Sequence, residues 1–451
     1  MDFRKTGRLW YDKCKKRFER DVRPFVEERA AAFKDKWLTD RIRLGVTGLT
    51  RSGKTTFITS LIYHLLRDTT LTVSIDDGFP ETGARFPYGE NIARLRAPKP
   101  EWPEPTADKS EIRLNIKKGK REFVLEIVDY PGEWLLDLPL AERSYAQWSA
   151  SVRRYLDEIG GEPPAWMRAA KVLEKGGLND AFQDEIVLEI ADKYRLWLHD
   201  LKKRGFSRLQ PGRFVLPDTA EDLYLFVNFF PWVGENDGGA LFEKLEARYE
   251  AYKKNKVEPF YANFKNLDRQ IVLVDCLSAL RGGAAAWRDL RFATDDILRH
   301  FSYGRRNRFI ARLLNSFKIG GVLFAATKAD YVSRDEKRIG ALTGVLKACV
   351  AEAAYNAFGA EPPEGFVEYR SVASVCAQAI DRSGDERCYY FPDGLHGIEL
   401  PVMLTPDRLN EFRDKCARFD AKPLPPRPMS ANGDPVGLEM YNVINYILGG
   451  V

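Results

Sequence analysis

The sequence predicts an α/β fold in which helices cover both faces of a mostly parallel β-sheet. Short apolar strands alternate along the chain with segments in which apolar residues recur at helical spacing, and turn residues follow several strands. One hairpin adds an antiparallel strand. A mainly helical insertion and an N-terminal helix are expected outside the sheet domain. The expected divisions are residues 1–40, 41–134, 135–265 and 266–451.

The first strands of the sheet are predicted from three segments. Residues 41–47 form an apolar strand, which a glycine-containing loop joins to a helix at Thr55–Leu66. Residues 68–107 are rich in proline and predict a long loop with only short elements. The strands of a hairpin follow at residues 112–116 and Phe123–Val128.

The remaining sheet is expected after the helical insertion. Strands are predicted at Ile271–Asp275, Gly320–Ala326 and Phe366–Val372, and a helix at Arg338–Phe358. Because helices separate them, these strands are expected to run parallel, each buried on both faces.

Composition places the chain among ordinary globular proteins. It has 451 residues, 44% hydrophobic and 30% charged, with a net charge of +5. That balance does not indicate specific nucleic-acid binding, which usually requires a strong basic patch. Six scattered cysteines lack metal-ligand spacing and predict reduced thiols in a cytoplasmic protein. No apolar run is long enough for a transmembrane segment, and no signal peptide is expected.

Residues 1–40 show apolar side chains at helical spacing among many charges. One interpretation is a helix that lies on a membrane surface or contacts a partner. The other is an amphipathic helix packed on its own domain. The sequence leaves both open.

The segment Gly48-Leu49-Thr50-Arg51-Ser52-Gly53-Lys54-Thr55 fits the phosphate-binding pattern G-x-x-x-x-G-K-[ST] between a strand and a helix. Its glycines allow the backbone to approach phosphates closely, and backbone N–H groups at the helix start bind anions. Lys54 is expected to neutralise the β- and γ-phosphates, and the Thr55 hydroxyl to bind Mg²⁺. The expected nucleotide-binding residues here are Gly48, Thr50, Arg51, Ser52, Gly53, Lys54, Thr55 and Thr56.

A second element, Asp129-Tyr130-Pro131-Gly132, follows the strand Phe123–Val128. The Asp129 carboxylate is expected to hold Mg²⁺ through a water, and the Gly132 N–H to contact the γ-phosphate. Loss of that phosphate would release the segment that follows. Asp275, at the end of another strand, is a rival metal carboxylate that we rank second.

A third element, Thr327-Lys328-Ala329-Asp330, also follows a strand. Asp330 can accept hydrogen bonds from guanine N1–H and the 2-amino group, which adenine lacks, so GTP is favoured over ATP. The Lys328 stem would lie over the base, although Thr327 replaces the commoner asparagine. By position, Ala373 and Ser374 after the last strand are expected to contact the base as well.

These elements in this order resemble the Ras-like (TRAFAC) GTPases, and more closely the YcjX family. The stretches Gly48–Thr55, Asp129–Leu135 and Thr327–Asp330 carry the resemblance, which extends to Asp393–Gly397. It implies a stress-associated cytoplasmic bacterial protein with a GTPase-like core. It also implies a membrane-embedded partner of the YcjF type, which would place the protein at the inner membrane.

Hydrolysis is expected to be slow. Ras-like GTPases usually place a glutamine after D-x-x-G to orient water, whereas this chain has Glu133, whose charge would repel the γ-phosphate. The expected catalytic residues are Lys54, Arg51, Glu133 and Gly132, with Arg51 acting in cis on the phosphates or pointing to solvent. Candidates for the magnesium-contacting threonine of the first switch are Thr69, Thr70, Thr72, Thr82 and Thr106. Among the histidines, His396 is the first to consider, although a structural role suits it better.

The sequence therefore predicts a Mg²⁺-dependent GTP-binding switch that hydrolyses GTP slowly. One alternative is a nucleotide-gated interaction protein with negligible turnover, and another is an ATPase or kinase of the phosphate-loop class. Comparison of GDP with ADP binding separates the last from the first two.

Overall fold

The computed structural model describes residues 41–48, 52–81, 83–104, 109–175, 180–217, 228–234, 237–264, 267–301, 321–332, 336–358, 366–376, 400–401, 404–416, 426, 437 and 439–448. The predicted N-terminal helix of residues 1–40 lies outside these ranges.

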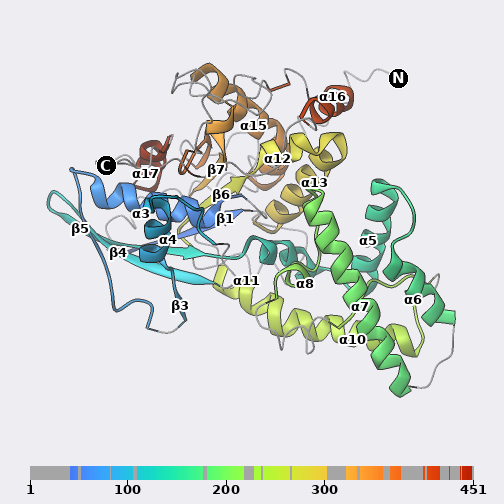
Figure 1. The fold of residues 1–451 in the computed structure, drawn as a ribbon. Helices are drawn as coiled ribbons and strands as arrows, with labels where there is room; N and C mark the ends of the chain where they lie inside the picture. The colour runs from blue at the N-terminus through green and yellow to red at the C-terminus, as the bar shows by residue number, and fades with distance from the viewer. Residues whose placement is uncertain are drawn as a thin grey trace, which may run out of the picture.

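One mixed sheet organises the described chain (Figure 1). Its strand order is β2-β4-β5-β1-β6-β7-β8, and β3 pairs with β4. Neighbours from β5 to β8 are parallel, whereas β4 is antiparallel to both β5 and β2. This confirms the mostly parallel sheet with an antiparallel hairpin strand. The strands are β1 (Arg41–Gly48), β2 (Thr72–Ile75), β3 (Ala84–Arg85), β4 (Ser110–Lys118), β5 (Arg121–Asp129), β6 (Arg269–Val274), β7 (Val322–Ala326) and β8 (Val367–Ser371).

Helices cover both faces of the sheet. Alternate residues of β6 show this: Ile271 and Leu273 belong to the core cluster beneath α3 (Lys54–Arg67) and α17 (Met440–Leu448). Val272 and Val274 belong to the cluster that includes the helices of the other face. Those helices are α12 (Cys276–Arg281), α13 (Gly283–Phe301) and α15 (Glu336–Phe358), with α16 (Pro406–Cys416) packed beside α12 and α13.

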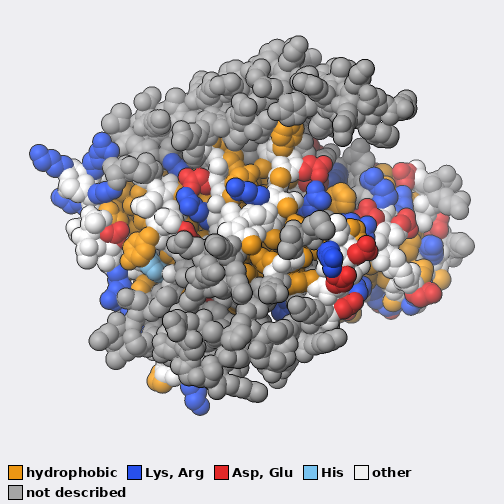
Figure 2. Space-filling model, turned by 90° about the horizontal axis from the view of Figure 1, so that it is seen from above, with side chains coloured by type: hydrophobic (Ala, Val, Ile, Leu, Met, Phe, Trp, Pro, Cys, Tyr) orange, Lys and Arg blue, Asp and Glu red, His pale blue; other side chains and the backbone are white. Residues whose placement is uncertain are grey.

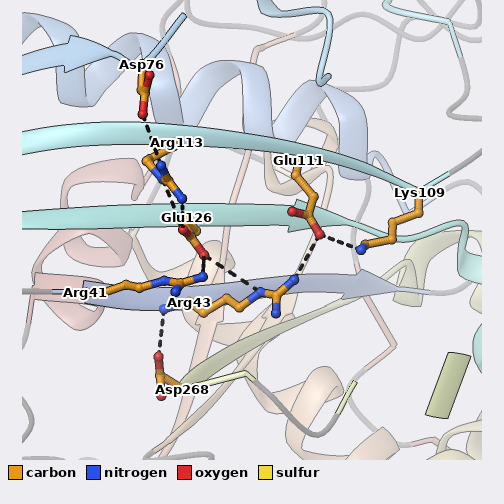
Figure 3. A network of polar contacts seen from close by, with 8 residues as sticks. All are labelled: Arg41, Arg43, Asp76, Lys109, Glu111, Arg113, Glu126 and Asp268. Atoms are coloured by element: carbon orange, nitrogen blue, oxygen red, sulfur yellow. Dashed lines mark hydrogen bonds and ion pairs between the residues drawn. The ribbon is translucent and has the colours of Figure 1, made fainter. Parts of the chain in front are cut away.

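A row of charged side chains ties β4, β5 and β1 together (Figure 3). Glu126 on β5 is almost fully buried and pairs with Arg41 at 2.5 Å and Arg113 at 2.7 Å, and Arg43 lies 4.0 Å away. Arg43 also reaches Glu111 at 2.9 Å. A buried carboxylate is costly unless it is paired. The row therefore links the three strands beside the end of β5 at Asp129.

The segment between β5 and β6 is mainly helical in its described parts, and its helices α5, α6, α7 and α10 extend to one side of the sheet in Figure 1. Aromatic side chains fill its core, with the Trp148 and Tyr249 rings stacked 5.4 Å apart. Its surface carries both signs of charge in the view of Figure 2. The elements are η1 (Gly132–Glu142), α5 (Tyr145–Ile159), α6 (Ala165–Lys175), α7 (Asp180–Lys203), α8 (Gly212–Val215), α10 (Ala240–Tyr252), η2 (Lys253–Val257) and α11 (Glu258–Phe264).

The proline-rich region contains only short elements: β2, β3 and the nine-residue helix α4 (Tyr88–Arg96). A short 3-10 turn, η3 (Ala329–Tyr331), follows β7. Three cysteines with described side chains, Cys276, Cys349 and Cys376, are free thiols and buried. Within the described ranges, none of the helices combines the length and apolarity that crossing a bilayer requires.

Candidate functional site

Four of the loops predicted to bind nucleotide leave the sheet at the same edge. Because β1, β5, β7 and β8 run parallel, their carboxyl ends lie together. The chain order also reverses around β1, which has β5 on one side and β6 on the other. Open α/β sheets bind their ligands at the carboxyl edge where the order reverses.

The loop between β1 and α3 has the backbone geometry of a phosphate cradle. Gly53 adopts φ +79° immediately before α3, a conformation that side chains disfavour. A Cβ atom at Gly48 would lie 2.4 Å from Ser52 Oγ and 2.7 Å from the Leu273 carbonyl oxygen on β6. Both glycines are therefore required by the local structure.

Several polar side chains lie where this loop joins α3. Lys54 Nζ donates a hydrogen bond to the Gly48 carbonyl at 3.2 Å. Ser52 is buried, and its hydroxyl has no hydrogen-bond partner among the described residues. Thr55 and Thr56 are half-buried in the first turn of the helix, where N–H groups lack intrahelical acceptors.

Thr50 and Arg51 lie outside the described residues, so the structure does not place the proposed cis-acting arginine.

Asp129 ends β5 beside the phosphate loop. It pairs in register with Val46 on β1, and its side chain is buried. The Asp129 carboxylate and the Thr55 hydroxyl thus come from segments that border the same strand end, and oxygen donors of these kinds suit Mg²⁺. Together with the glycine cradle, this donor set fits a magnesium–phosphate group.

Gly132 and Glu133 begin η1. Gly132 follows Pro131 and lies three residues after Asp129. The Glu133 carboxylate is almost fully buried and accepts a hydrogen bond from Lys202 Nζ at 2.8 Å. Burial alone would raise the pKa of Glu133, but the positive charges of Lys54 and Lys202 outweigh it and hold the pKa below its ordinary value. Glu133 is therefore ionised: it pairs with Lys202 of the insertion, and the charge of Lys54 in the phosphate loop also acts on it.

Hydrogen bonds from α8 and α10 hold the middle of η1 in place. Asp137 is completely buried and accepts hydrogen bonds from the Gly212 N–H at 2.6 Å, the Tyr252 hydroxyl at 2.6 Å and Arg213 at 3.2 Å. The Arg213 guanidinium also lies over the Trp134 ring, 4.1 Å from its centroid. Sequence reasoning missed these contacts of Lys202, Gly212 and Arg213, and no local pattern marks them.

The loop after β7 is held by its neighbours. The Thr327 N–H bonds the Val274 carbonyl, and the Ala329 N–H bonds the Val372 carbonyl, both at 3.1 Å. Lys328 adopts φ +63°, an unusual value for a residue with a side chain. Asp330 is buried at the start of η3.

Asp275 binds this loop. Its carboxylate pairs with Lys328 Nζ at 2.5 Å and caps α12 through the Ser278 N–H at 3.0 Å. Burial would raise the pKa of Asp275, but Lys328 and Ser278 together hold it below the ordinary value. The carboxylate ranked second as a metal ligand is thus engaged in a structural pair, and Lys328 points to it.

Ala373 and Ser374 follow β8, and Ser374 contacts α3. Ala373 is buried, and the Ser374 carbonyl accepts a hydrogen bond from the Ser60 hydroxyl. The base loop proposed here is therefore anchored to the helix that begins at the phosphate loop.

Several threonines proposed for the first switch lie far from the phosphate loop. Thr69, Thr70 and Thr72 follow the C-terminal end of α3, whereas the loop precedes its N-terminus. At 1.5 Å per residue, the 14-residue helix separates the two sites by about 20 Å. These three residues do not contact the candidate site in this structure. Thr82, Thr106 and His396, and the stretch Asp393–Gly397, lie outside the described residues.

A family model and two similar proteins all relate this chain to YcjX proteins. A sequence model of the YcjX-like family, DUF463, matches residues 42–387. The protein named "Ras-like GTPase YcjX" from Escherichia coli (strain K12) is 36% identical over 388 residues, covering 76% of this chain and 81% of that protein. The protein of the same name from Shewanella oneidensis is 35% identical over 356 residues, covering 68% and 72% respectively. Because the family match spans most of the chain, and includes the phosphate loop and both of the other motif loops, this protein belongs to the YcjX-like family.

Proposed function

We propose that this protein is a Mg²⁺-dependent GTP-binding protein that hydrolyses GTP slowly and acts as a nucleotide-controlled switch. The observation that carries the proposal is the convergence of the phosphate loop, Asp129 and the Thr327–Asp330 loop on one edge of the sheet. The names of the two relatives, both called Ras-like GTPases, support it.

The proposed mechanism relies mainly on positioning. Backbone N–H groups at the start of α3 and the Lys54 ammonium bind the β- and γ-phosphates. The Ser52 hydroxyl, buried in the loop, offers one more hydrogen bond to a phosphate oxygen. Asp330 accepts the guanine N–H groups, which sets base preference.

Magnesium would be held by the Thr55 hydroxyl and, through water, by Asp129, and it would neutralise charge on the phosphates.

Slow turnover follows from the state of Glu133. A water-positioning group must be oriented toward the attacking water, whereas the hydrogen bond and ion pair with Lys202 restrain this carboxylate toward the insertion. That contact also favours a second candidate function, a nucleotide-gated interaction protein with almost no hydrolysis.

The wider biological role belongs to the same proposal and rests on the family resemblance alone. It comprises a cytoplasmic protein of the bacterial stress response with a membrane-embedded partner of the YcjF type, which would bring it to the inner membrane. The division into residues 1–40, 41–134, 135–265 and 266–451 also remains a proposal.

The first test is binding of labelled GDP and ADP, with Mg²⁺, to wild type, Lys54→Ala and Asp330→Asn. GDP should bind far more tightly than ADP, and Lys54→Ala should abolish binding. Asp330→Asn should shift preference toward xanthine nucleotides, because the asparagine amide can donate to the 2-oxo group of xanthine. Equal binding of ADP, unaffected by Asp330→Asn, would show that the base-recognition argument is wrong.

A further inference from the structure

The helical insertion contributes a charged side chain that contacts Glu133, the residue after the Asp129–Gly132 element. Lys202 lies in the last turn of α7 and donates to Glu133 Oε1 at 2.8 Å. Its side chain is 23% exposed, and that of Glu133 is 9% exposed, so water screens the pair only weakly. Lys202 is 69 residues from Glu133 in the sequence, and only the folded insertion brings the two together.

Backbone packing fixes the position of Glu133. A Cβ atom at Gly212 would lie 1.7 Å from the Glu133 carbonyl oxygen, so the insertion backbone passes directly over this residue. The Gly212 N–H then bonds Asp137 one turn further along η1. The Glu133 backbone therefore cannot move away from the insertion without separating η1 from α8.

The charge of Glu133, and its pairing with Lys202, would affect how the site binds a γ-phosphate. Glu133 immediately follows the D-x-x-G element and is close enough to Lys54 for the two charges to interact. An ionised carboxylate at that position would repel an incoming γ-phosphate. With Lys202 present, the group of Lys54, Glu133 and Lys202 carries a net positive charge, since it contains two ammonium groups and one carboxylate.

We propose that Lys202 is a specificity-determining residue, which neutralises Glu133 so that the site accepts the γ-phosphate of GTP. The helical insertion thereby completes the triphosphate site rather than only covering it. This inference rests on the proposed guanine-nucleotide binding. Under this inference the Glu133 charge repels the γ-phosphate less than the sequence alone suggests, because the carboxylate is already paired with Lys202.

The test is a charge-compensation cycle with Lys202→Met, Lys202→Arg, Glu133→Gln and the double variant Glu133→Gln/Lys202→Met. Affinities are measured for GDP and for a non-hydrolysable GTP analogue, with Mg²⁺. Lys202→Met should weaken the GTP analogue by about tenfold or more and GDP much less, because the extra phosphate charge lies nearest the unpaired carboxylate. Lys202→Arg should preserve the wild-type ratio of the two affinities.

The double variant decides between a charge effect and a loss of structure. It should recover most of the affinity for the GTP analogue, since removal of the Glu133 charge makes its counter-ion unnecessary. Lys203→Met, at the exposed neighbour on α7, is the matched control and should leave both affinities unchanged.

Equal weakening of GDP and the GTP analogue by Lys202→Met, or no recovery in the double variant, would overturn the role of Lys202. A wild-type protein that binds neither nucleotide would instead overturn the proposed function, and this inference with it.

Discussion

Glycine positions define the candidate site at the scale of single residues. Gly53 needs a left-handed backbone, and Gly48 needs the space that a side chain would occupy. At Gly48 the obstructing atoms include the Leu273 carbonyl oxygen, a backbone atom of a central strand that cannot rotate away. The phosphate loop is thus built against β6 as well as between β1 and α3.

We expect Gly48→Ala to destabilise the protein by about 1–3 kcal/mol, the usual cost of forcing an extra methyl group into a packed site. Nucleotide affinity should fall as well, because the loop must shift to make room. Denaturant unfolding and GDP titration measure the two effects. Gly89→Ala is a suitable control, since a Cβ there meets nothing within 4 Å. Unchanged stability would contradict the packing argument.

At the scale of elements, Asp275 links three parts of the sheet edge. It follows β6, caps α12 and pairs with Lys328 in the loop after β7. The strained backbone of Lys328 is held in place partly by this pair. The same contact orients the loop that carries Asp330, so stability and base recognition are connected here.

We expect Asp275→Asn to reduce the free energy of unfolding by about 1.5–3 kcal/mol at neutral pH, the typical contribution of a hydrogen bond to a charged group. The folded-state pKa of Asp275 lies below the ordinary value of 3.8. Its stabilising contribution is therefore complete well above pH 3.8 and is lost as the pH falls through that value toward the folded-state pKa.

The difference in free energy of unfolding between wild type and Asp275→Asn should accordingly stay constant from neutral pH down to roughly pH 5 and become smaller at lower pH. Urea unfolding at several pH values measures it. The exposed Asp157→Asn on α5 serves as control and should show little difference throughout. If the difference in free energy of unfolding did not become smaller at low pH, the ion pair would not be what stabilises the fold.

The elements of the sheet were predictable because their signals are local. The hairpin of β4 and β5 follows from residue alternation around a glycine turn, and the phosphate loop follows from fixed spacing between two glycines and Lys54. The role of Asp275 could not be predicted, because an aspartate after a buried strand suits a metal site and a helix cap equally well. Its partner Lys328 lies 53 residues away, and only the fold brings them together.

At the scale of the whole molecule, η1 joins the candidate nucleotide site to the insertion. η1 begins three residues after Asp129, and near its middle Asp137 bonds Gly212 of α8 and Tyr252 at the end of α10. A rearrangement of Gly132 around a γ-phosphate would therefore strain contacts that hold the insertion. The sequence could not show this, since the partners of Asp137 lie 75 or more residues away.

This arrangement predicts that nucleotide state alters the insertion through Asp137. Amide hydrogen exchange should differ between the GDP-bound and GTP-analogue-bound protein in η1 and also at Gly212–Val215, because the Gly212 N–H bonds the Asp137 carboxylate. Asp137→Asn keeps the shape of the side chain but removes the charge that Arg213 pairs with. It should leave the exchange difference in η1 and reduce the one in α8. A nucleotide-dependent change in η1 that never reaches α8 in the wild type would mean that the insertion is a fixed support, and that the switch acts on some other surface.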